Sequence, residues 1–377
     1  MKTVTDGKVK WGVIGAGGIS SRTIPDGILQ ADNIELIGIA DLYPERAAEY
    51  ADRYNCNAYA NVEELVSDPQ IEAVYLGTPP FVHAEHAILA AKHGKHVLSE
   101  KPMATSAAEA KAMVDASNEN GVLLGHGTMM RFNASHAKMK EKIDAGELGK
   151  LLSVHGIYSV YWDPGLPKDT GKDKDILDLE QGEGRQLAWR QISRLSGGGP
   201  MADDGIHAID TMVYLMGHVA EVASFTDTLT RDRDVEDTAT VVLKFESGAQ
   251  GLLECYSSVP NFKGRRSLRV MGDKGVLLSK ETLGPPMMVA DDGTITRHNR
   301  LFQFRGFTGE AHDEEMQPEE IYLDHVMMYK KQFGGFSDAI RGKSSYRNLG
   351  DEGLHSMRVL EAALTASKER RFVTIEK

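Results

Sequence analysis

The sequence predicts two domains: a doubly wound α/β domain over residues 1–128 and an α+β domain over residues 129–377. The first prediction rests on short apolar runs that alternate with helical stretches up to residue 128, since such alternation indicates crossover connections and a parallel sheet. The second rests on closely spaced β-rich segments from residue 219 to residue 297, because short connections favour antiparallel hairpins. A chain of 377 residues also exceeds the length that one hydrophobic core usually organises.

In the first domain, five apolar runs provide the expected strands, and helical stretches separate several of them. The runs are VKWGVIGAG, IELIGIAD, EAVYLGTP, KHVLSEKP and VLLGHGT. Helical patterns cover residues 44–55, 82–93 and 105–119. We therefore expect a parallel sheet between layers of helices.

In the second domain, the turn sequences ESGA, GDKG and DDGT divide the β-rich part, and we expect antiparallel hairpins there. Residues 351–371 place apolar side chains at helical intervals and predict a packed amphipathic helix. Two polar stretches, residues 163–196 and 297–320, are longer than ordinary connections. We expect each to be a long loop that covers a site or extends from the fold.

The composition narrows the classes of function. With 43 basic and 55 acidic residues the net charge is -12, which argues against a general nucleic-acid or membrane-surface binder. No run of about 18 apolar residues occurs, and the first residues lack the apolar core of a signal peptide. The two cysteines, Cys56 and Cys255, form no metal-ligand pattern and fit a reducing compartment. We expect a cytoplasmic protein without a nucleic-acid or membrane partner.

The segment WGVIGAGGIS carries the first chemical signal. Gly15, Gly17 and Gly18 follow an apolar strand and precede a helix, so that the backbone can present amide hydrogens to a pyrophosphate. Ser20 stands where a third glycine or alanine is usual. Asp41 ends the second strand and can accept hydrogen bonds from ribose hydroxyls, while its charge repels a 2′-phosphate. The pattern predicts a Rossmann domain that binds NAD rather than NADP; a plain glycine turn with an exposed aspartate is the alternative.

Two later strand ends are expected at the same edge of the sheet. GTPPFVH follows one strand and SEKP follows the next, and the carboxyl ends of parallel strands line the ligand crevice. Lys101 is therefore predicted near the nicotinamide, although a lysine before a proline also suits a solvated turn, and His83 also suits a packed position. The predicted cofactor-binding residues are Gly15, Gly17, Gly18, Ile19, Ser20, Asp41, Leu42, Thr78, Pro79, His83, Glu100 and Lys101.

The segment GGGPMADDGIHAID carries the second signal. On a helix, its spacing places Asp203, His207 and Asp210 on one face. Asp203 as a helix cap and His207 as a buried core histidine are the structural alternatives. No further His or Cys cluster stands nearby to complete a metal site, so we predict no metal. Asp204 and Asp210 are expected to be structural.

These motifs resemble the family of glucose-fructose oxidoreductase and inositol dehydrogenase, the Gfo/Idh/MocA-type NAD(P)-dependent oxidoreductases. The resemblance extends over nearly the whole chain, through GVIGAGGIS, IADLYPERA, GTPPFVHAEHAILAAKHGKHVLSEKPMA, MMRFN, GGGPMADDGIHAID, VLKFESGAQG, MGDKGVL and DEGLHSMRVLEAALTASKERR. It implies a Rossmann domain, a second domain with a large, mostly antiparallel open sheet that commonly mediates dimers or tetramers, and oxidation of a sugar or cyclitol hydroxyl by a bound nicotinamide cofactor. By motif position, the family's lysine, aspartate and histidine fall on Lys101, Asp203 and His207.

Alcohol oxidation gives these three residues roles as the predicted catalytic set. A base near neutral pKa must take the hydroxyl proton, which suits His207. Asp203 can hold the imidazole or bind a substrate hydroxyl, and Lys101 can stabilise developing alkoxide. The glycine run 197–199 is expected to let the backbone approach cofactor or sugar. The predicted substrate-binding residues are Lys101, Arg131, Trp162, Arg190, Asp203 and His207.

The sequence therefore predicts an NAD-dependent oxidoreductase that acts on a secondary hydroxyl of a sugar, sugar derivative or cyclitol, as a homodimer or homotetramer. Two alternatives remain open at this point. One is a glycosidase that uses NAD transiently for oxidation and elimination. The other is a non-catalytic regulator that senses a sugar or NAD on the same fold.

Overall fold

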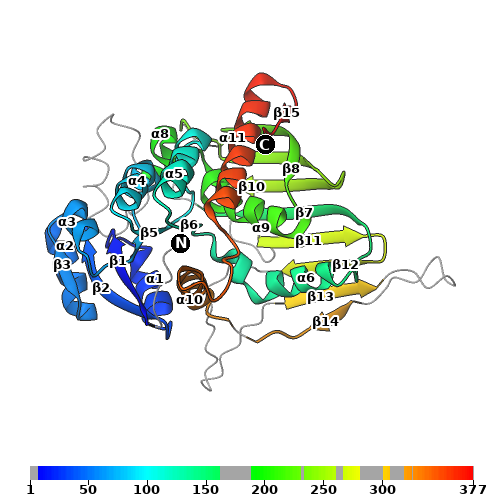
Figure 1. The fold of residues 1–377 in the computed structure, drawn as a ribbon. Coiled ribbons are helices and arrows are strands. Elements are labelled where there is room, and N and C mark those ends of the chain that lie inside the picture. Colours follow the sequence, from blue (N-terminus) through cyan, green and yellow to red (C-terminus); the bar gives the residue numbers. More distant parts are fainter. Residues whose placement is uncertain are drawn as a thin grey trace, which may run out of the picture. The chain divides into compact units, whose positions relative to one another are not determined.

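The computed structural model describes residues 7–161, 188–230, 233–259, 266–280, 300–305, 318–324 and 326–376. The chain divides into two compact units, each with its own sheet (Figure 1). Unit 1 comprises Met1–Met129, Leu166–Gly198 and Met327–Arg358. Unit 2 comprises Met130–Gly165, Gly199–Val326 and Val359–Lys377.

Unit 1 contains a six-stranded sheet in the order β3-β2-β1-β4-β5-β6, in which every neighbouring pair is parallel. This order is that of dinucleotide-binding domains, in which the two halves of the sheet diverge between β1 and β4. The predicted Rossmann domain is thereby confirmed. The strands are β1 (Val9–Ile14), β2 (Ile34–Ala40), β3 (Asn57–Tyr59), β4 (Ala73–Leu76), β5 (His96–Ser99) and β6 (Leu124–His126).

The helices between these strands begin and end at local signals. The side chain of Asn61 accepts from the amide of Glu64 at the start of α3, and Ser106 accepts from Glu109 at the start of α5. Asn55 ends α2 in the left-handed conformation. The helices are α1 (Ser20–Thr23) with the π-helical η1 (Ile24–Ile28), α2 (Pro44–Tyr54), α3 (Val62–Ser67), η2 (Pro80–Val82), α4 (His83–Lys92) and α5 (Ala107–Glu119).

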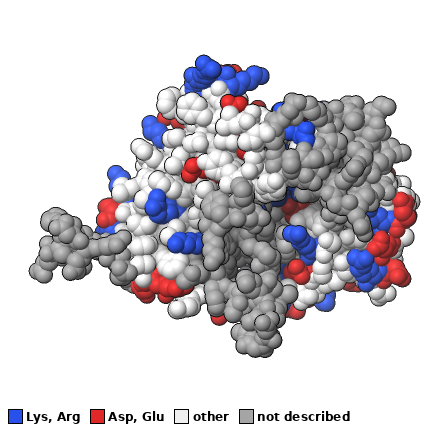
Figure 2. All heavy atoms as spheres, turned by 180° about the vertical axis from the view of Figure 1, so that it is seen from behind, with Lys and Arg blue, Asp and Glu red and all other residues white. Residues whose placement is uncertain are grey.

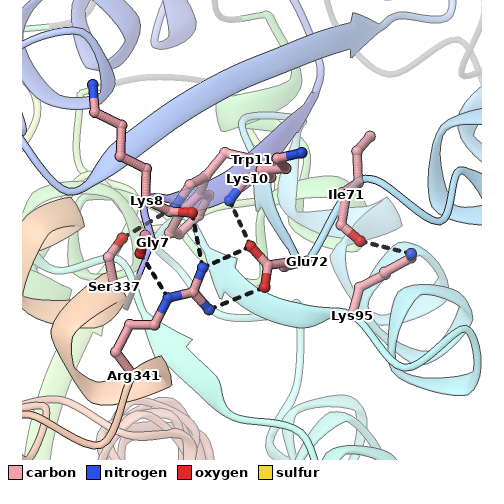
Figure 3. A network of polar contacts seen from close by, with 9 residues as sticks. All are labelled: Gly7, Lys8, Lys10, Trp11, Ile71, Glu72, Lys95, Ser337 and Arg341. Carbon is pink, nitrogen blue, oxygen red and sulfur yellow. Dashed lines mark hydrogen bonds and ion pairs between the residues drawn. The ribbon is translucent and has the colours of Figure 1, made fainter. Parts of the chain in front are cut away.

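Helix α10 (Met328–Ile340) joins unit 1 from far along the chain. Figure 3 shows how: Arg341, at its end, donates to both carboxylate oxygens of Glu72, at 3.0 and 2.8 Å, and to the carbonyl of Gly7 at 2.9 Å. The indole of Trp11 donates to Ser337 at 3.1 Å. These contacts fix α10 against the amino ends of β1 and β4, away from the carboxyl edge at which ligands are expected.

Unit 2 contains a nine-stranded sheet in the order β14-β13-β12-β11-β7-β10-β9-β8-β15. Every neighbouring pair is antiparallel except β7 and β10, so the predicted large, mostly antiparallel sheet is confirmed. ESGA and GDKG form the expected hairpin turns, whereas DDGT lies outside the described residues. The strands are β7 (Leu151–Ser159), β8 (Val219–Asp227), β9 (Thr238–Phe245), β10 (Gln250–Tyr256), β11 (Arg266–Gly272), β12 (Gly275–Lys280), β13 (Arg300–Arg305), β14 (Glu319–Ile321) and β15 (Val373–Thr374).

The expectation of two long loops is wrong where the structure describes them. Strand β13 and the first two residues of β14 lie within residues 297–320 and extend the sheet. Leu301 and Gln303 of β13 are buried, and this alternation was hidden in a stretch that is polar overall. Within residues 163–196, the described part forms η4 (Ala188–Gln191) and α8 (Ser193–Ser196).

Helices cover one face of the nine-stranded sheet in unit 2 (Figure 1). They include α6 (Ala134–Asp144), α9 (Ile206–Met216) and part of α11 (Gly350–Glu369), which confirms the predicted amphipathic helix near the end of the chain. Ser367 of α11 accepts from the amide of Thr226 in β8 at 2.8 Å. No helix in the described part of the chain is long and apolar enough to cross a membrane.

The other face of this sheet lacks such a cover of helices (Figure 1). Val242 and Leu252 lie opposite each other there on β9 and β10, and Val242 is 49% exposed. Phe225, on the neighbouring strand β8, is 83% exposed. Seen from behind, this part of the surface is mostly uncharged, with scattered charged side chains (Figure 2).

Candidate active site

The glycine loop of unit 1 turns tightly after β1. Gly15 has φ +99°, and a Cβ there would lie 2.9 Å from the carbonyl carbon and oxygen of Gly77, after β4. A Cβ at Gly17 would meet nothing within 4 Å among the described atoms. Ser20 is buried, and its hydroxyl donates to the carbonyl of Gly15 at 2.6 Å. The loop thus combines a tight turn with open space over Gly17, as close approach of a pyrophosphate requires.

Asp41 lies directly after β2 and joins the glycine loop to the start of α2. One carboxylate oxygen accepts from the amide of Ala16 at 2.6 Å, and the other accepts from the amide of Tyr43 at 2.9 Å. Arg46 approaches it to 3.9 Å. The neighbouring Leu42 is 67% exposed, which leaves an apolar side chain for contact with a flat ring. The position of Asp41 after β2 matches the prediction, whereas its bond to the loop was not predicted.

Glu100 holds the turn that carries Lys101 after β5. Its carboxylate accepts from the hydroxyl of Tyr75 at 2.8 Å and from the amide of Lys101 at 3.1 Å. Burial raises the pKa of Glu100, and the positive charges of Lys101 and Arg190 oppose that rise. Glu100 is thus a buried support, while Lys101 itself is half-buried.

His83 ties together two of the predicted strand-end segments. Its Nδ1 lies 3.0 Å from the carbonyl of Pro102 and its Nε2 lies 2.8 Å from the carbonyl of Thr78. Burial lowers the pKa of His83 to about 4, although both carbonyls act in the opposite direction. The contacts match the packed-histidine alternative. By contrast, the hydroxyl of Thr78 is buried without a hydrogen-bond partner among the described residues, as expected of a group awaiting a ligand.

The segment with Asp203 and His207 is not one regular α-helix. Residues Met201–Gly205 form the π-helical η5, and α9 starts at Ile206. The regular α-helix assumed in predicting a shared face is therefore present from Ile206 onward but not at Asp203, whose place on that face stays a prediction. Gly205 is required at this point, since a Cβ there would lie 2.7 Å from the sulfur of Cys255. His207 is buried on α9, and Asp203 is half-buried.

Two arginines hold the other acids of this segment. Asp210 receives two bonds from Arg131, at 3.0 and 2.9 Å, and both side chains are buried. Asp204 receives two bonds from Arg266, at 2.7 and 3.1 Å. Asp204 and Asp210 therefore have the structural role expected of them. Arg131 is not a surface residue, and its contact with substrate stays a prediction.

The caps of the two helical pieces are not provided by Asp203. The N-cap residues are Pro200 for η5 and Gly205 for α9, and neither has a side-chain cap bond. Glu236 of the β8–β9 connection accepts instead from the amides of Gly199 at 2.8 Å and Met201 at 3.1 Å. Glu236 could not be predicted as a partner of this segment, because nothing in VEDT indicates a contact across 37 residues.

The explanation given for the glycine run is wrong at two positions. A Cβ at Gly197 would lie 2.7 Å from the carbonyl oxygen of Thr105, and a Cβ at Gly199 would collide with the carbonyl oxygen of Glu236. These glycines make room for the protein's own backbone, so no ligand is needed to explain them.

The remaining predicted residues are placed as follows. Arg190 lies 4.5 Å above the ring of Trp189 in unit 1, and its charge acts on Glu100. Trp162 lies outside the described residues. Ile19 and Pro79 are half-buried, and Gly18 is exposed. Among the residues that the structure describes, no group of three or more His, Cys, Asp or Glu side chains could hold a metal ion.

Two sets of predicted residues are thus assembled, one in each unit. In unit 1, the carboxyl ends of four parallel strands carry the glycine loop, Asp41, Thr78 and Lys101. In unit 2, Asp203 and His207 lie on consecutive helical pieces. The first set has the composition of a dinucleotide site.

Comparison with known proteins decides the family. Residues 9–128 match the oxidoreductase family with an NAD-binding Rossmann fold, and residues 136–278 match the GFO/IDH/MocA C-terminal domain. The chain belongs to the GFO/IDH/MocA family of oxidoreductases. It is an enzyme of this family, and its Rossmann domain binds NAD.

Named members of the GFO/IDH/MocA family act on sugars and polyols. The chain is 27% identical to 1,5-anhydro-D-fructose reductase of Ensifer adhaerens, over 97% of this chain and 98% of that protein. It is 26% identical to myo-inositol 2-dehydrogenase of Thermotoga maritima, over 97% and 98%. Among solved structures, levoglucosan dehydrogenase in complex with NADH and levoglucosan superposes with a TM-score of 0.80, at 22% identity over 98% of this chain and 100% of that one.

Proposed function

We propose that the protein oxidises a secondary hydroxyl group of a sugar, sugar derivative or cyclitol with NAD as the acceptor. The observation that carries the proposal is the position of Lys101. It follows β5, at the same edge of the parallel sheet as the glycine loop and Asp41, and Glu100 bonds its amide at 3.1 Å. A cation fixed beside a dinucleotide loop is suited to stabilise negative charge that develops on a substrate oxygen.

The residues of unit 1 fit the cofactor. The open space over Gly17 suits a pyrophosphate, and the exposed side chain of Leu42 suits the adenine ring. The buried hydroxyl of Thr78 provides a polar contact farther along the edge. Asp41 favours ribose hydroxyls and hence NAD over NADP, while Arg46 at 3.9 Å reduces the repulsion of a 2′-phosphate. Gly15, Gly18, Ile19, Ser20, Pro79, His83 and Glu100 complete the proposed cofactor site, the last two as supports.

The chemistry follows from the residues of both units. Bound NAD supplies the hydride acceptor. His207 takes the proton of the hydroxyl group, since a base must contact that oxygen as the carbon is oxidised. Lys101 donates a hydrogen bond to the same oxygen and stabilises its charge. Asp203 orients the imidazole or binds a second hydroxyl of the substrate.

We further propose that residues 1–128 form the cofactor domain and residues 129–377 the substrate and assembly domain, although Met327–Arg358 pack in the same compact unit as the Rossmann sheet. Arg131, Trp162 and Arg190 are the proposed additional substrate contacts. Two nitrogens of Arg131 are already bonded to Asp210, so its contribution is to hold α9 in place as much as to contact a sugar.

Steady-state formation of NADH across a panel of cyclitols, aldoses, and amino and anhydro sugars tests the proposed activity. We expect at least one polyol to give turnover with NAD. Cleavage of an aryl glycoside without net NADH would instead indicate a glycosidase. Binding of NAD with no turnover of any sugar, together with a specific protein partner, would indicate a regulator.

We also propose that the uncovered face of the nine-stranded sheet joins copies of this chain into a dimer or tetramer. The exposed apolar side chains of Val242 and Phe225 support the proposal. Light scattering tests it: Val242→Glu should reduce the molecular mass in solution, and an unchanged mass would place the interface elsewhere.

A further inference from the structure

The start of the segment that carries Asp203 and His207 depends on one carboxylate. Glu236 Oε2 accepts from the amide of Gly199 at 2.8 Å, and Oε1 accepts from the amide of Met201 at 3.1 Å. Pro200, between them, has no amide hydrogen to offer. Glu236 thus uses one oxygen for the Gly199 amide before η5 and the other for the amide of Met201, the first residue of η5, which is the task that a cap residue usually performs.

The surroundings of Glu236 disfavour the ionised form of its side chain. Its side chain is buried, and the neighbouring acidic Asp237 adds to the effect of burial. The thiol of Cys255, in β10, also interacts electrostatically with Glu236 and with Asp204 of η5. Asp204 is paired with Arg266 of β11, whose guanidinium is thereby already bonded to an acid. Burial without a paired cation destabilises the ionised form of an acid, and here only hydrogen bonds from backbone amides offset that effect. The role of Glu236 therefore lies in the backbone that it binds.

We infer that Glu236 is a positioning residue that holds the Asp203 and His207 segment in the conformation needed for catalysis. This inference rests on the proposed function of those two residues. Glu236 acts through the backbone and contacts neither substrate nor cofactor. Its acceptors fix where the π-turn begins, and the π-turn in turn sets the direction in which Asp203 leaves the helix.

A second consequence concerns pH. The ionised carboxylate accepts a hydrogen bond from each amide through a different oxygen. Protonation places an O–H donor on one of these oxygens, which makes that oxygen a poorer acceptor for its amide. Burial raises the pKa of Glu236 to about 7, so the acid becomes protonated as the pH falls below neutrality. One of its two amide bonds is then weakened while the side chain stays buried, so the amides of Gly199 and Met201 lose protection at low pH, although protonation of a buried acid with a raised pKa favours the folded chain as a whole.

Amide hydrogen exchange followed by mass spectrometry tests the inference without relying on turnover. In Glu236→Gln at pH 8, we expect exchange in residues 199–205 to become about tenfold faster or more, because one amide loses its charged acceptor. The matched control is Asp237→Asn. Asp237 accepts from the amides of Leu229 and Thr230, at 3.0 and 2.8 Å, so its loss should speed exchange there and leave residues 199–205 unchanged.

The wild-type protein provides the second arm of the experiment. After correction for intrinsic rates, exchange in residues 199–205 should speed up below pH 7, and this change should be absent from Glu236→Gln. If Glu236→Gln does not fold, the wild-type pH series alone decides. Unchanged protection of residues 199–205 in both arms would overturn the inference.

Kinetics then separate positioning from general stability. We expect Glu236→Gln to lower kcat at least about tenfold with little change in the KM for NAD, and Glu236→Asp to restore part of it, because the charge returns. Equal kcat in the folded Gln variant and the wild type would overturn the inference. Absence of turnover in the wild type would count against the proposed function alone, since the exchange results stand independently.

Discussion

Arg131 and Asp210 form a buried, doubly bonded ion pair, with Nε to Oδ2 at 3.0 Å and Nη2 to Oδ1 at 2.9 Å. The pair joins η3 (Met129–Phe132) to α9, the helix that carries His207. The guanidinium also lies 5.3 Å from the ring centre of Tyr214. The position of the proposed base therefore depends on a charge pair 79 residues apart in the sequence.

Removing one member of this pair should strongly lower the free energy of unfolding. Arg131→Met leaves the carboxylate of Asp210 buried without its main counter-charge, which typically costs about 3–5 kcal/mol. Urea unfolding measures the loss. Arg131→Met/Asp210→Leu should recover most of it, because the uncompensated charge is gone. A loss below about 1 kcal/mol in the single variant would contradict the importance of the pair.

Asp41→Ala should weaken the binding of NAD about tenfold or more, since the side chain serves both the ribose and the amide of Ala16 in the glycine loop. The binding of NADP should weaken less, because removal of the acid also removes repulsion of the 2′-phosphate. Calorimetric titration with each nucleotide provides the measurement. Asp52→Ala, at an exposed position of α2, is the control. Equal weakening of both nucleotides would count against the ribose contact.

The free energy of unfolding should fall as the pH drops from about 6.5 toward 4. Burial lowers the pKa of four histidines, His83, His86, His96 and His136, from 6.5 to about 4. In this window the unfolded chain binds more protons than the folded one, so acid favours unfolding. The pKa of Glu236 is raised to about 7, so its protonation stabilises the folded chain as the pH falls. This one group opposes the effect of the four histidines but is outnumbered by them.

Urea titrations between pH 8 and pH 5 check this prediction. The His86→Leu variant should show a shallower pH dependence, because it removes one buried imidazole whose Nδ1 has no hydrogen-bond partner in the described part of the chain. A free energy of unfolding that stays constant from pH 7 to pH 5 would show that these histidines are not buried in the neutral form.

Lys101→Ala and His207→Ala should each reduce kcat by about 10²-fold or more, because each removes an interaction with the reacting oxygen. The dissociation constant of NAD should change little in His207→Ala. Lys111→Ala and His93→Ala change the same residue types at more exposed positions and should retain wild-type rates. Rates that stay unchanged in Lys101→Ala or His207→Ala would remove the role assigned to that residue.

Local patterns in the sequence were sufficient for the fold class and for the cofactor edge. The alternation of apolar runs and helices predicted the parallel sheet of the Rossmann domain, and the predicted glycine loop and Asp41 lie at the carboxyl ends of β1 and β2, where their contact with a dinucleotide stays a prediction. Strand β3 and helix α3 were missed, because three and six residues are too few for a periodic pattern.

The supports of the site could not be predicted, because they depend on partners far apart in the chain. Nothing near Glu236 indicates that it bonds Gly199, and nothing near Arg131 indicates Asp210. The π-turn at Met201–Gly205 was not predicted for a different reason. The spacing of three and four residues was interpreted for a regular α-helix, and the sequence carries no separate signal for a π-turn.

The central claim is that Lys101 and His207 act on one substrate oxygen. A crystal structure of the ternary complex with NAD and a polyol that the enzyme turns over tests it most directly. We predict one hydroxyl oxygen within hydrogen-bond reach, about 2.6–3.2 Å, of both the ammonium of Lys101 and a ring nitrogen of His207. A substrate that contacts the two side chains through different oxygens, or neither of them, would contradict the claim.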